Sequence, residues 1–327
     1  MKENILAIID HDELYLNKFM NYFCTREEQV FECYAFSDEE MLCKFSREKA
    51  IDILIISSDV SENTIKKIKA LKILSMLEEN NPAEQIKKIN RYQPVSNIYR
   101  EVMKNLADMP VSAVQITGSK VKETELIAVY SPVGRTLKTT FAIALGQMIA
   151  EKKKTLYLNL EEYAGFDRSM QNTAEADILD LIFYMHGKQV NFSYKLASMV
   201  KEIEGMDYIP PAIAAYELTD IEAADWQQLL DRLSECGYEV VIIDTGNTIR
   251  GIPEIMERCK KIYMPVRDDP AARTKISQFE TAMRISGHEK IIKRIQKFSF
   301  PYFEDAENHM DNIKNSSIGR YIRKINI

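Results

Sequence analysis

The 327-residue chain lacks the cysteine pattern of a disulfide-stapled or zinc-binding protein. Its five cysteines are odd in number and widely spaced, and no two of them form a C-x-x-C pair. This usage favours free thiols in a reducing compartment. The four histidines are scattered as well and show no metal-ligand spacing. The sequence therefore indicates neither a metal centre of that kind nor a Cys-His or Ser-His-Asp catalytic group.

Long apolar runs and an excess of basic residues are also absent. No segment approaches the ~20 apolar residues of a membrane span. The start, MKENILAIID, does not match a signal peptide, because its apolar run is strand-length and flanked by acids. The net charge is −6, with Lys and Arg spread along the chain, which argues against nucleic acid as a specific partner. We therefore expect a cytoplasmic protein.

The composition is that of a globular protein, with 46% hydrophobic and 28% charged residues, and the length suits two domains. The clearest break is a polar, weakly periodic stretch that begins with Asp-Met-Pro. The sequence predicts a first domain at residues 1–107, a linker at 108–123 and a second domain at 124–327.

Short apolar strands alternate with amphipathic helices in both halves, which predicts two doubly wound α/β domains. The first is expected to be flavodoxin-like, and its helix 37–47 begins with a Ser37-x-x-Glu40 capping signal. The expected strands are 4–9, 30–34, 51–56, 126–130, 155–160, 239–243 and 261–265, and the other main helices are 13–24, 139–152 and 221–236.

The strongest chemical signal is the segment SPVGRTLKTT between an apolar strand and an amphipathic helix. In a P-loop, backbone N–H groups and a helix N-terminus surround phosphates, a lysine reaches the β- and γ-oxygens, and a hydroxyl binds Mg²⁺. Lys138 and Thr139 suit the last two roles. The predicted nucleotide-binding residues are Gly134, Arg135, Thr136, Leu137, Lys138, Thr139 and Thr140.

The strict pattern G-x-x-x-x-G-K-[ST] is not met, because Leu137 precedes the lysine. Glycines in such loops supply positive φ angles, so Arg135 and Leu137 predict an altered loop geometry. A chance G-x-x-x-K-T-T at a strand–helix junction is the alternative interpretation.

Two later strand ends favour the nucleotide site. Asp244 ends the apolar strand of YEVVIIDTGN, where a carboxylate coordinates Mg²⁺ through water in P-loop proteins. Asn159 and Glu161 follow the strand after the loop's helix, beside the expected γ-phosphate. We therefore expect ATP and Mg²⁺ as ligands, with Thr139 and Asp244 at the metal and Glu161 as a candidate catalytic residue.

This half resembles the MinD/ParA superfamily of deviant-Walker ATPases, whose loop reads Lys-Gly-Gly-x-Gly-Lys-[Ser/Thr]. Asp244-Thr-Gly matches the family's later strand end, whereas Asn159 and Glu161 replace two aspartates. Val133 stands at the signature lysine, which in the family reaches the partner's ATP across a nucleotide-sandwich dimer. The resemblance implies an ATP-bound homodimer with weak or absent hydrolysis, since losing one such charge lowers the rate greatly.

Residues 1–107 resemble a response-regulator receiver domain with altered chemistry. A receiver has an acidic pair after its first strand, an acceptor aspartate after its third and Lys-Pro after its fifth. Here Asp10 is kept, but His11 replaces the second acid, Ser57 the acceptor and Gln93 the lysine. Aspartyl phosphorylation needs these groups. The resemblance therefore implies a pseudo-receiver that serves as a docking or dimerisation module.

The combination is similar to the TadZ/CpaE family, which positions the Tad (Flp, type IVb) pilus secretion machinery. This resemblance implies Tad pilus components and a polar landmark or membrane-associated partner, with the protein concentrated at a pole or at the inner face of the membrane. Two other functions stay open. An active ParA/MinD-type ATPase in partition or in flagellar or division positioning would need the missing lysine, and a response regulator would need an acceptor at Ser57.

The C-terminal segment carries apolar residues at helical spacing, Ile318, Tyr321, Ile322 and Ile325, with basic residues off that face. MinD-like proteins can end in a membrane-binding helix, and basic charge would favour an anionic leaflet. The segment is short and contains Gly319, so we favour docking onto its own domain.

Overall fold

The chain forms two compact units in a computed structural model. The first comprises Met1–Ser119 with Lys188–Ser198, and the second comprises Lys120–Gly187 with Met199–Ile327. The chain therefore passes between the units three times. The structure describes residues 4–24, 30–77, 87–109, 123–163, 176–187, 191–301, 303 and 312–325. Most of the predicted linker, residues 110–122, lies outside the described residues.

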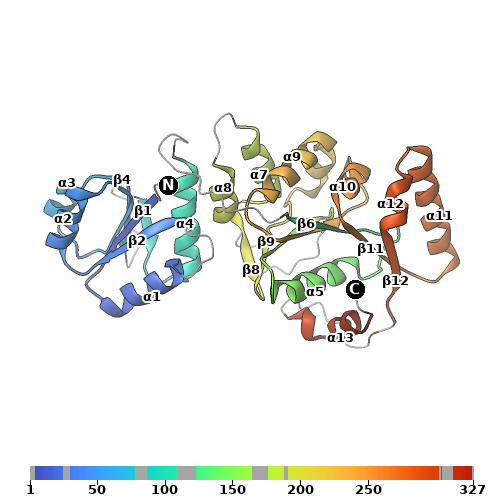
Figure 1. Ribbon diagram of the computed structural model, residues 1–327, viewed down its shortest axis with the longest axis horizontal. Coiled ribbons are helices and arrows are strands. Elements are labelled where there is room, and N and C mark those ends of the chain that lie inside the picture. The colour runs from blue at the N-terminus through green and yellow to red at the C-terminus, as the bar shows by residue number, and fades with distance from the viewer. Residues whose placement is uncertain are drawn as a thin grey trace. The chain divides into compact units, whose positions relative to one another are not determined.

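The first unit is a five-stranded parallel sheet in the order β2-β1-β3-β4-β5, with helices on both faces (Figure 1). Such a sheet buries its central strands on both sides, and β1 and β3 accordingly consist almost entirely of buried apolar residues. The elements are β1 (Asn4–Ile9), α1 (Glu13–Cys24), β2 (Phe31–Phe36), α2 (Glu39–Glu48), β3 (Ile51–Ile56), α3 (Glu62–Lys67), β4 (Ala70–Leu77), β5 (Lys87–Asn90), α4 (Val95–Ala107) and most of α8 (Phe192–Met199).

The doubly wound fold expected for this unit is confirmed, but the predicted helix start at Ser37 is wrong. Helix α2 begins at Glu39, two residues later, because Asp38 and not Ser37 is its N-cap and accepts a hydrogen bond from the Met41 N–H at 2.8 Å. The carbonyl of Ser37 instead contacts the His11 ring at 2.9 Å. Asp and Ser are comparable caps, so adjacent candidates are not separated by propensity alone.

The second unit is a seven-stranded sheet in the order β12-β11-β6-β10-β7-β9-β8, parallel except for β8. The strand β12 was not predicted, because its half-exposed, charged sequence lacks an apolar run. No helix in the described part of the chain is long and apolar enough to cross a membrane. The elements are β6 (Glu125–Val129), α5 (Lys138–Ala150), β7 (Thr155–Leu160), α7 (Ile178–Met185), β8 (Lys201–Ile203), β9 (Met206–Ile209), α9 (Ala223–Ser234), β10 (Val240–Thr245), α10 (Ile252–Arg258), β11 (Lys261–Val266), α11 (Pro270–Ile285), α12 (Glu289–Arg294), β12 (Ile295–Ser299) and α13 (Ser317–Lys324).

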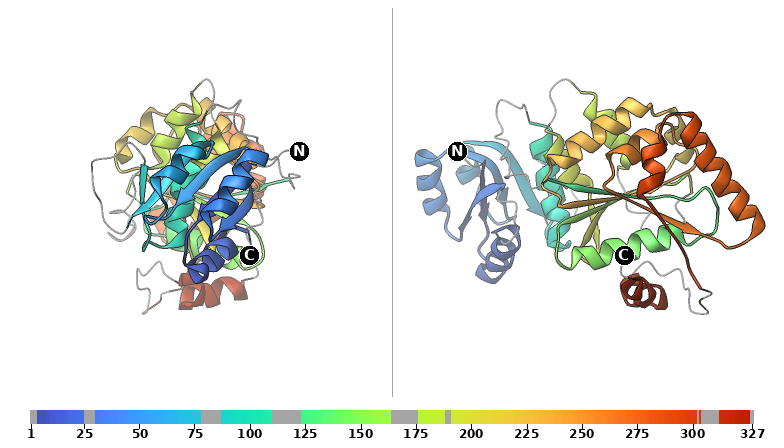
Figure 2. Two further views of the ribbon diagram at one scale, coloured as in Figure 1. Left: turned by 90° about the vertical axis from the view of Figure 1, so that its left-hand side faces the viewer. Right: turned by 45° about the vertical axis from the view of Figure 1, so that its right-hand side comes forward.

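The C-terminal helix α13 packs on α5, and α5 covers one face of the sheet (Figure 2). Ile318 and Ile322 are each 2% exposed and lie in the same apolar cluster as residues of α5. The Lys314 N–H donates to the Gln147 side chain at 3.1 Å. An added Cβ at Gly319 would lie 2.1 Å from the Lys314 carbonyl oxygen, so this close approach requires glycine. The helix is thus docked on its own domain.

Candidate functional site

The candidate nucleotide site lies where β6, β7 and β10 end side by side. Asp244 is paired in register with Val129 of β6 on one side and with Asn159 of β7 on the other. The loop 130–137 leaves β6 at this edge and leads into α5. Ligands of open α/β sheets bind at the carboxyl ends of the strands, and the N-terminus of α5 adds unpaired N–H groups suited to anions. The fold therefore brings the predicted loop and the later strand ends together.

The loop keeps the backbone angles for which glycine is suited, although it has other residues there. Arg135 and Leu137 have φ angles of 57° and 58°, in the left-handed region. The side chains of Arg135 and Leu137 predicted a loop of altered geometry, but the φ angles of these two residues are those of a glycine-containing loop. A left-handed non-glycine residue costs about 1–2 kcal/mol, so the loop holds local strain.

The loop side chains differ in exposure. Gly134 and Arg135 are exposed, whereas Thr136 is buried, with its hydroxyl 3.5 Å from the Val133 carbonyl oxygen. Thr140 is half-buried in the first turn of α5. The charged contacts of the site are made by Lys138.

Lys138 is buried and already engaged by the chain itself. Its ammonium group forms an ion pair with Glu161 and donates a hydrogen bond to the Thr245 carbonyl oxygen. It also lies 3.8 Å from Asp244 Oδ1. The side chain is 9% exposed and that of Glu161 is 25% exposed, so this pair is only partly screened by water. A phosphate that binds Lys138 must therefore compete with Glu161.

Asp244 is a fully buried carboxylate with an incomplete set of hydrogen bonds. Its Oδ2 accepts from the Tyr157 hydroxyl at 3.0 Å and lies 3.5 Å from Asn159 Nδ2. Among the described residues, Oδ1 has no hydrogen-bond partner. Burial raises the pKa of Asp244 to about 6, against the lowering effects of Lys138 and of the Thr139 and Tyr157 hydroxyls. Burial also raises the pKa of Tyr157, which keeps this donor protonated.

The oxygen atoms at this point suit Mg²⁺. Hard divalent cations prefer carboxylate, hydroxyl and water oxygens. A buried carboxylate oxygen without a hydrogen-bond partner is costly unless a cation or water completes it. Asp244 Oδ1 and the hydroxyl of Thr139, which lies beside the carboxyl group, therefore fit this metal.

The two other predicted strand-end residues are held by short local contacts. Asn159 donates to the Tyr157 hydroxyl at 2.9 Å, and its Oδ1 accepts from the Glu161 N–H at 2.9 Å. An added Cβ at Gly246 would lie 2.5 Å from the Leu160 carbonyl oxygen, so only glycine lets β10 end this close to β7. This close approach places Glu161 within reach of Lys138.

Val133 provides no charge to the site. It stands where the MinD/ParA pattern has its signature lysine, and it is only 8% exposed. Its backbone N–H donates to the Ser131 hydroxyl at 3.2 Å. An apolar, buried side chain here contributes to packing rather than to ligand binding.

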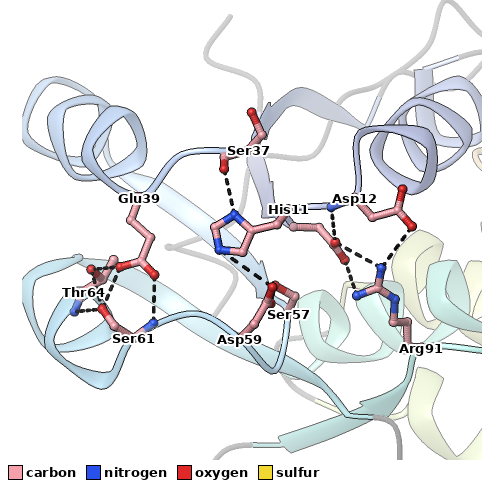
Figure 3. A network of polar contacts seen from close by, with 10 residues as sticks. His11, Asp12, Ser37, Glu39, Ser57, Asp59, Ser61, Thr64 and Arg91 are labelled. Carbon is pink, nitrogen blue, oxygen red and sulfur yellow. Dashed lines mark hydrogen bonds and ion pairs between the residues drawn. The ribbon is translucent and has the colours of Figure 1, made fainter.

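The acidic pocket of the first unit contains an arginine that the sequence analysis missed. Asp10 is 1% exposed, and its carboxylate lies 2.9 Å and 3.1 Å from the two terminal nitrogens of Arg91. Arg91 also reaches Asp12 at 3.5 Å (Figure 3). Its guanidinium group lies over the Tyr15 ring, 4.7 Å from the ring centroid. A basic residue directly after β5, two positions before Gln93, was the available signal.

Ser57, at the position of a receiver's phosphoacceptor, also makes local contacts. The Ser57 hydroxyl donates to Asp59, and the His11 ring lies 3.8 Å from the same carboxylate. Nearby, Glu39 accepts hydrogen bonds from Ser61 and Thr64, and these lower its pKa to about 2. Pro94 is the N-cap of α4, where no N–H is required. Among the residues described around Asp10, Ser57 thus stands at the acceptor position and the acids are paired with Arg91.

Comparison with known structures finds partition and division proteins that are similar to part of this chain. A ParA family ATPase from Chlorobium tepidum TLS has 16% identity and a TM-score of 0.49, with 62% of this chain and 98% of that chain covered. A plasmid partition protein from Borrelia burgdorferi B31 bound to AMPPNP has 14% identity and a TM-score of 0.43, covering 62% and 100%. The MinC:MinD cell division complex of Aquifex aeolicus has 16% identity and a TM-score of 0.40, covering 53% and 67%. Likeness at this level carries no conclusion on activity.

Comparison with families matches the first unit. Residues 1–107 match the family described as "TadZ-like, receiver domain". No curated protein matches the chain. The strand order, the loop after β6 and the strand ends beside it are those expected of a P-loop fold. Residues 1–107 therefore match a TadZ-like receiver domain, and they are followed by an α/β unit whose loop and strand ends are those expected of a P-loop fold.

Proposed function

We propose that the second unit binds ATP with Mg²⁺ at the loop between β6 and α5. The observation that carries this proposal is the meeting of Lys138, Thr139 and the buried Asp244 at the N-terminus of α5. The ammonium group would bind the β- and γ-phosphate oxygens, and the backbone N–H groups of the α5 terminus would bind phosphate as well. Thr139 and Asp244 would hold the metal, which neutralises phosphate charge when bound.

The proposed site favours binding over hydrolysis. Fast phosphoryl transfer requires cations positioned on the transferring group, and each well-placed charge is worth orders of magnitude in rate. Val133 is apolar and buried at the position of the signature lysine. Glu161, the candidate catalytic residue, forms an ion pair with Lys138 in this arrangement. We infer weak or absent ATPase activity.

For the whole protein we propose a scaffold that localises the Tad pilus secretion machinery, acting as an ATP-bound dimer. The match of residues 1–107 to the TadZ-like receiver domain supports this assignment. The receiver-like unit would serve as a docking module, since Ser57 replaces the phosphoacceptor and Arg91 neutralises the acidic pocket. Its partners would be Tad components and a polar or membrane-associated landmark.

Cell imaging tests the localisation proposal separately from nucleotide binding. Deletion of the gene should disperse the polar focus of a labelled Tad component, and the wild-type gene should restore it. A Lys138→Ala gene should restore it poorly if nucleotide is needed. Normal foci in the deletion strain would refute the localisation role and leave the nucleotide site to be judged by binding alone.

A further inference from the structure

The carboxylate of Asp10 depends on a cation for its charge balance. The residue follows β1 directly and is 1% exposed, so water screens its charge poorly. Its Oδ1 accepts a hydrogen bond from the Asp12 N–H at 2.8 Å. Its Oδ2 has no hydrogen-bond partner among the described residues and is compensated by an ion pair alone. A buried carboxylate is costly unless a positive charge lies beside it.

Arg91 supplies this charge from another strand. It follows β5, which β3 and β4 separate from β1 in the sheet, so a long side chain is needed to reach Asp10. Its Nη1 lies 2.9 Å from Asp10 Oδ2, and its Nη2 lies 3.1 Å from Asp10 Oδ1. The guanidinium group thus contacts both oxygens, in the bidentate arrangement that arginine and a carboxylate favour.

The guanidinium group is held by two further neighbours. Its Nη2 also lies 3.5 Å from Asp12 Oδ2 (Figure 3), so two carboxylates converge on one nitrogen atom. The Tyr15 ring lies against the group, and the Tyr15 hydroxyl donates to the Arg91 carbonyl oxygen at 3.4 Å. The Arg91 side chain is only 15% exposed. The cation is therefore packed into the pocket.

These contacts do not fit the divalent cation that a receiver fold implies at its acids. Mg²⁺ binds carboxylate and water oxygens at about 2.1 Å. To reach Asp10 it would have to displace the guanidinium group, which lies within 3.1 Å of both oxygens, or approach it against like-charge repulsion. Arginine stays protonated at any physiological pH, so its charge is not lost by titration.

We propose that Arg91 is the resident cation of the receiver-like unit: it occupies Asp10 and Asp12 in place of a divalent metal ion and keeps Mg²⁺ out of this pocket. The charge balance of the pocket is then part of the chain and does not vary with the Mg²⁺ concentration. Removing the guanidinium group would leave two converging carboxylates, and Mg²⁺ is commonly held by one or two carboxylates together with waters. Loss of Arg91 should therefore create a site for a divalent cation.

Counting bound Mn²⁺ in the full-length, nucleotide-free protein tests the proposal. Mn²⁺ shares the preference of Mg²⁺ for oxygen ligands, and the paramagnetic resonance signal of the free ion measures how much is bound. We expect Arg91→Met to bind about one Mn²⁺ per chain more than wild type, held by the uncovered carboxylates. The double variant Arg91→Met/Asp10→Asn should return to the wild-type number. Ions bound in the second unit are common to all variants and cancel.

Arg100→Met is the matched control. Arg100 is a partly buried arginine of the same unit, and its guanidinium group donates to the Asn97 side chain. The variant removes the same positive charge away from Asp10, so it should bind as much Mn²⁺ as wild type. Equal binding by wild type and folded Arg91→Met would overturn the proposal. So would an additional ion that Asp10→Asn does not remove, or the same gain in Arg100→Met.

A measurement on wild type alone decides the question if Arg91→Met does not fold. Hydrogen exchange of the amides in residues 10–16 should be the same with and without millimolar Mg²⁺, because no ion enters the pocket. Slower exchange of these amides in Mg²⁺ would show that the pocket binds the metal despite Arg91, and would refute the proposal. None of these measurements involves nucleotide, so their failure and that of the ATP site are distinguishable.

Discussion

Glu161 is expected to lower the affinity of the site for ATP, and Glu161→Gln should raise it. In the structure this carboxylate forms an ion pair with Lys138, the residue that would bind the phosphates. Nucleotide must separate the pair or bring phosphate charge close to the carboxylate. A hydrogen bond to a charged group at a poorly solvated position is worth about 1.5–3 kcal/mol. Removing the competing charge should therefore tighten binding by about 10- to 100-fold, since 1.4 kcal/mol corresponds to tenfold.

Isothermal titration with ATP and Mg²⁺ measures this directly, with Glu162→Gln as the control. Glu162 is the neighbouring carboxylate, partly exposed, so its variant removes the same charge without changing the contact to Lys138. Equal affinities for the two variants would show that Glu161 does not compete for the lysine. A weaker affinity in Glu161→Gln would refute the reasoning more strongly, because Glu161 would then assist binding.

Three further predictions concern stability and are measured by urea unfolding. Arg135→Gly should be more stable than Arg135→Ala by about 0.5–1 kcal/mol, because the left-handed backbone at φ 57° disfavours alanine; equal stabilities would show that the loop is unstrained. Arg91→Met should lower the free energy of unfolding by about 3 kcal/mol by leaving the buried Asp10 without its cation, and Arg91→Lys should lower it less; a loss below 1 kcal/mol in Arg91→Met would mean that the pair is dispensable. Without nucleotide, Asp244→Asn should gain stability over wild type as the pH rises from about 4 to about 6. The folded carboxyl, with its pKa raised from 3.8 to about 6, holds its proton more tightly than the unfolded one, so wild type loses stability across this window, by about 3 kcal/mol for 2.2 pKa units. A difference that does not change with pH would contradict the raised pKa.

The fold and the core of the candidate nucleotide site could be predicted because they depend on simple regularities. Buried parallel strands are continuous apolar runs, and their carboxyl ends meet at one edge. Lys138 and Asp244 could therefore be expected to meet although they are far apart in sequence. The same rule placed Glu161 at this edge, but not its ion pair with Lys138, since side-chain contacts depend on the close approach of β10 and β7 at Gly246.

Other features could not be found from the sequence. Arg91 was missed because the receiver pattern has its lysine at the position of Gln93. The cation that pairs with Asp10 comes instead from Arg91, two residues earlier, whose long side chain can reach the carboxylate. The place of α8 was missed because an amphipathic pattern shows that a helix has a buried face, not which core buries it. Strand β12 has no apolar run, so only its pairing with β11 identifies it.

Nucleotide binding by the full-length protein tests the central claim most directly. Purified wild type and Lys138→Ala would be titrated with ATP and Mg²⁺ by calorimetry, with molecular mass followed by light scattering and phosphate release assayed in parallel. We predict that wild type binds and dimerises with little or no phosphate release, and that Lys138→Ala loses at least tenfold in affinity, the loss of one charged hydrogen bond. Absence of binding in wild type, or equal binding by Lys138→Ala, would contradict the account.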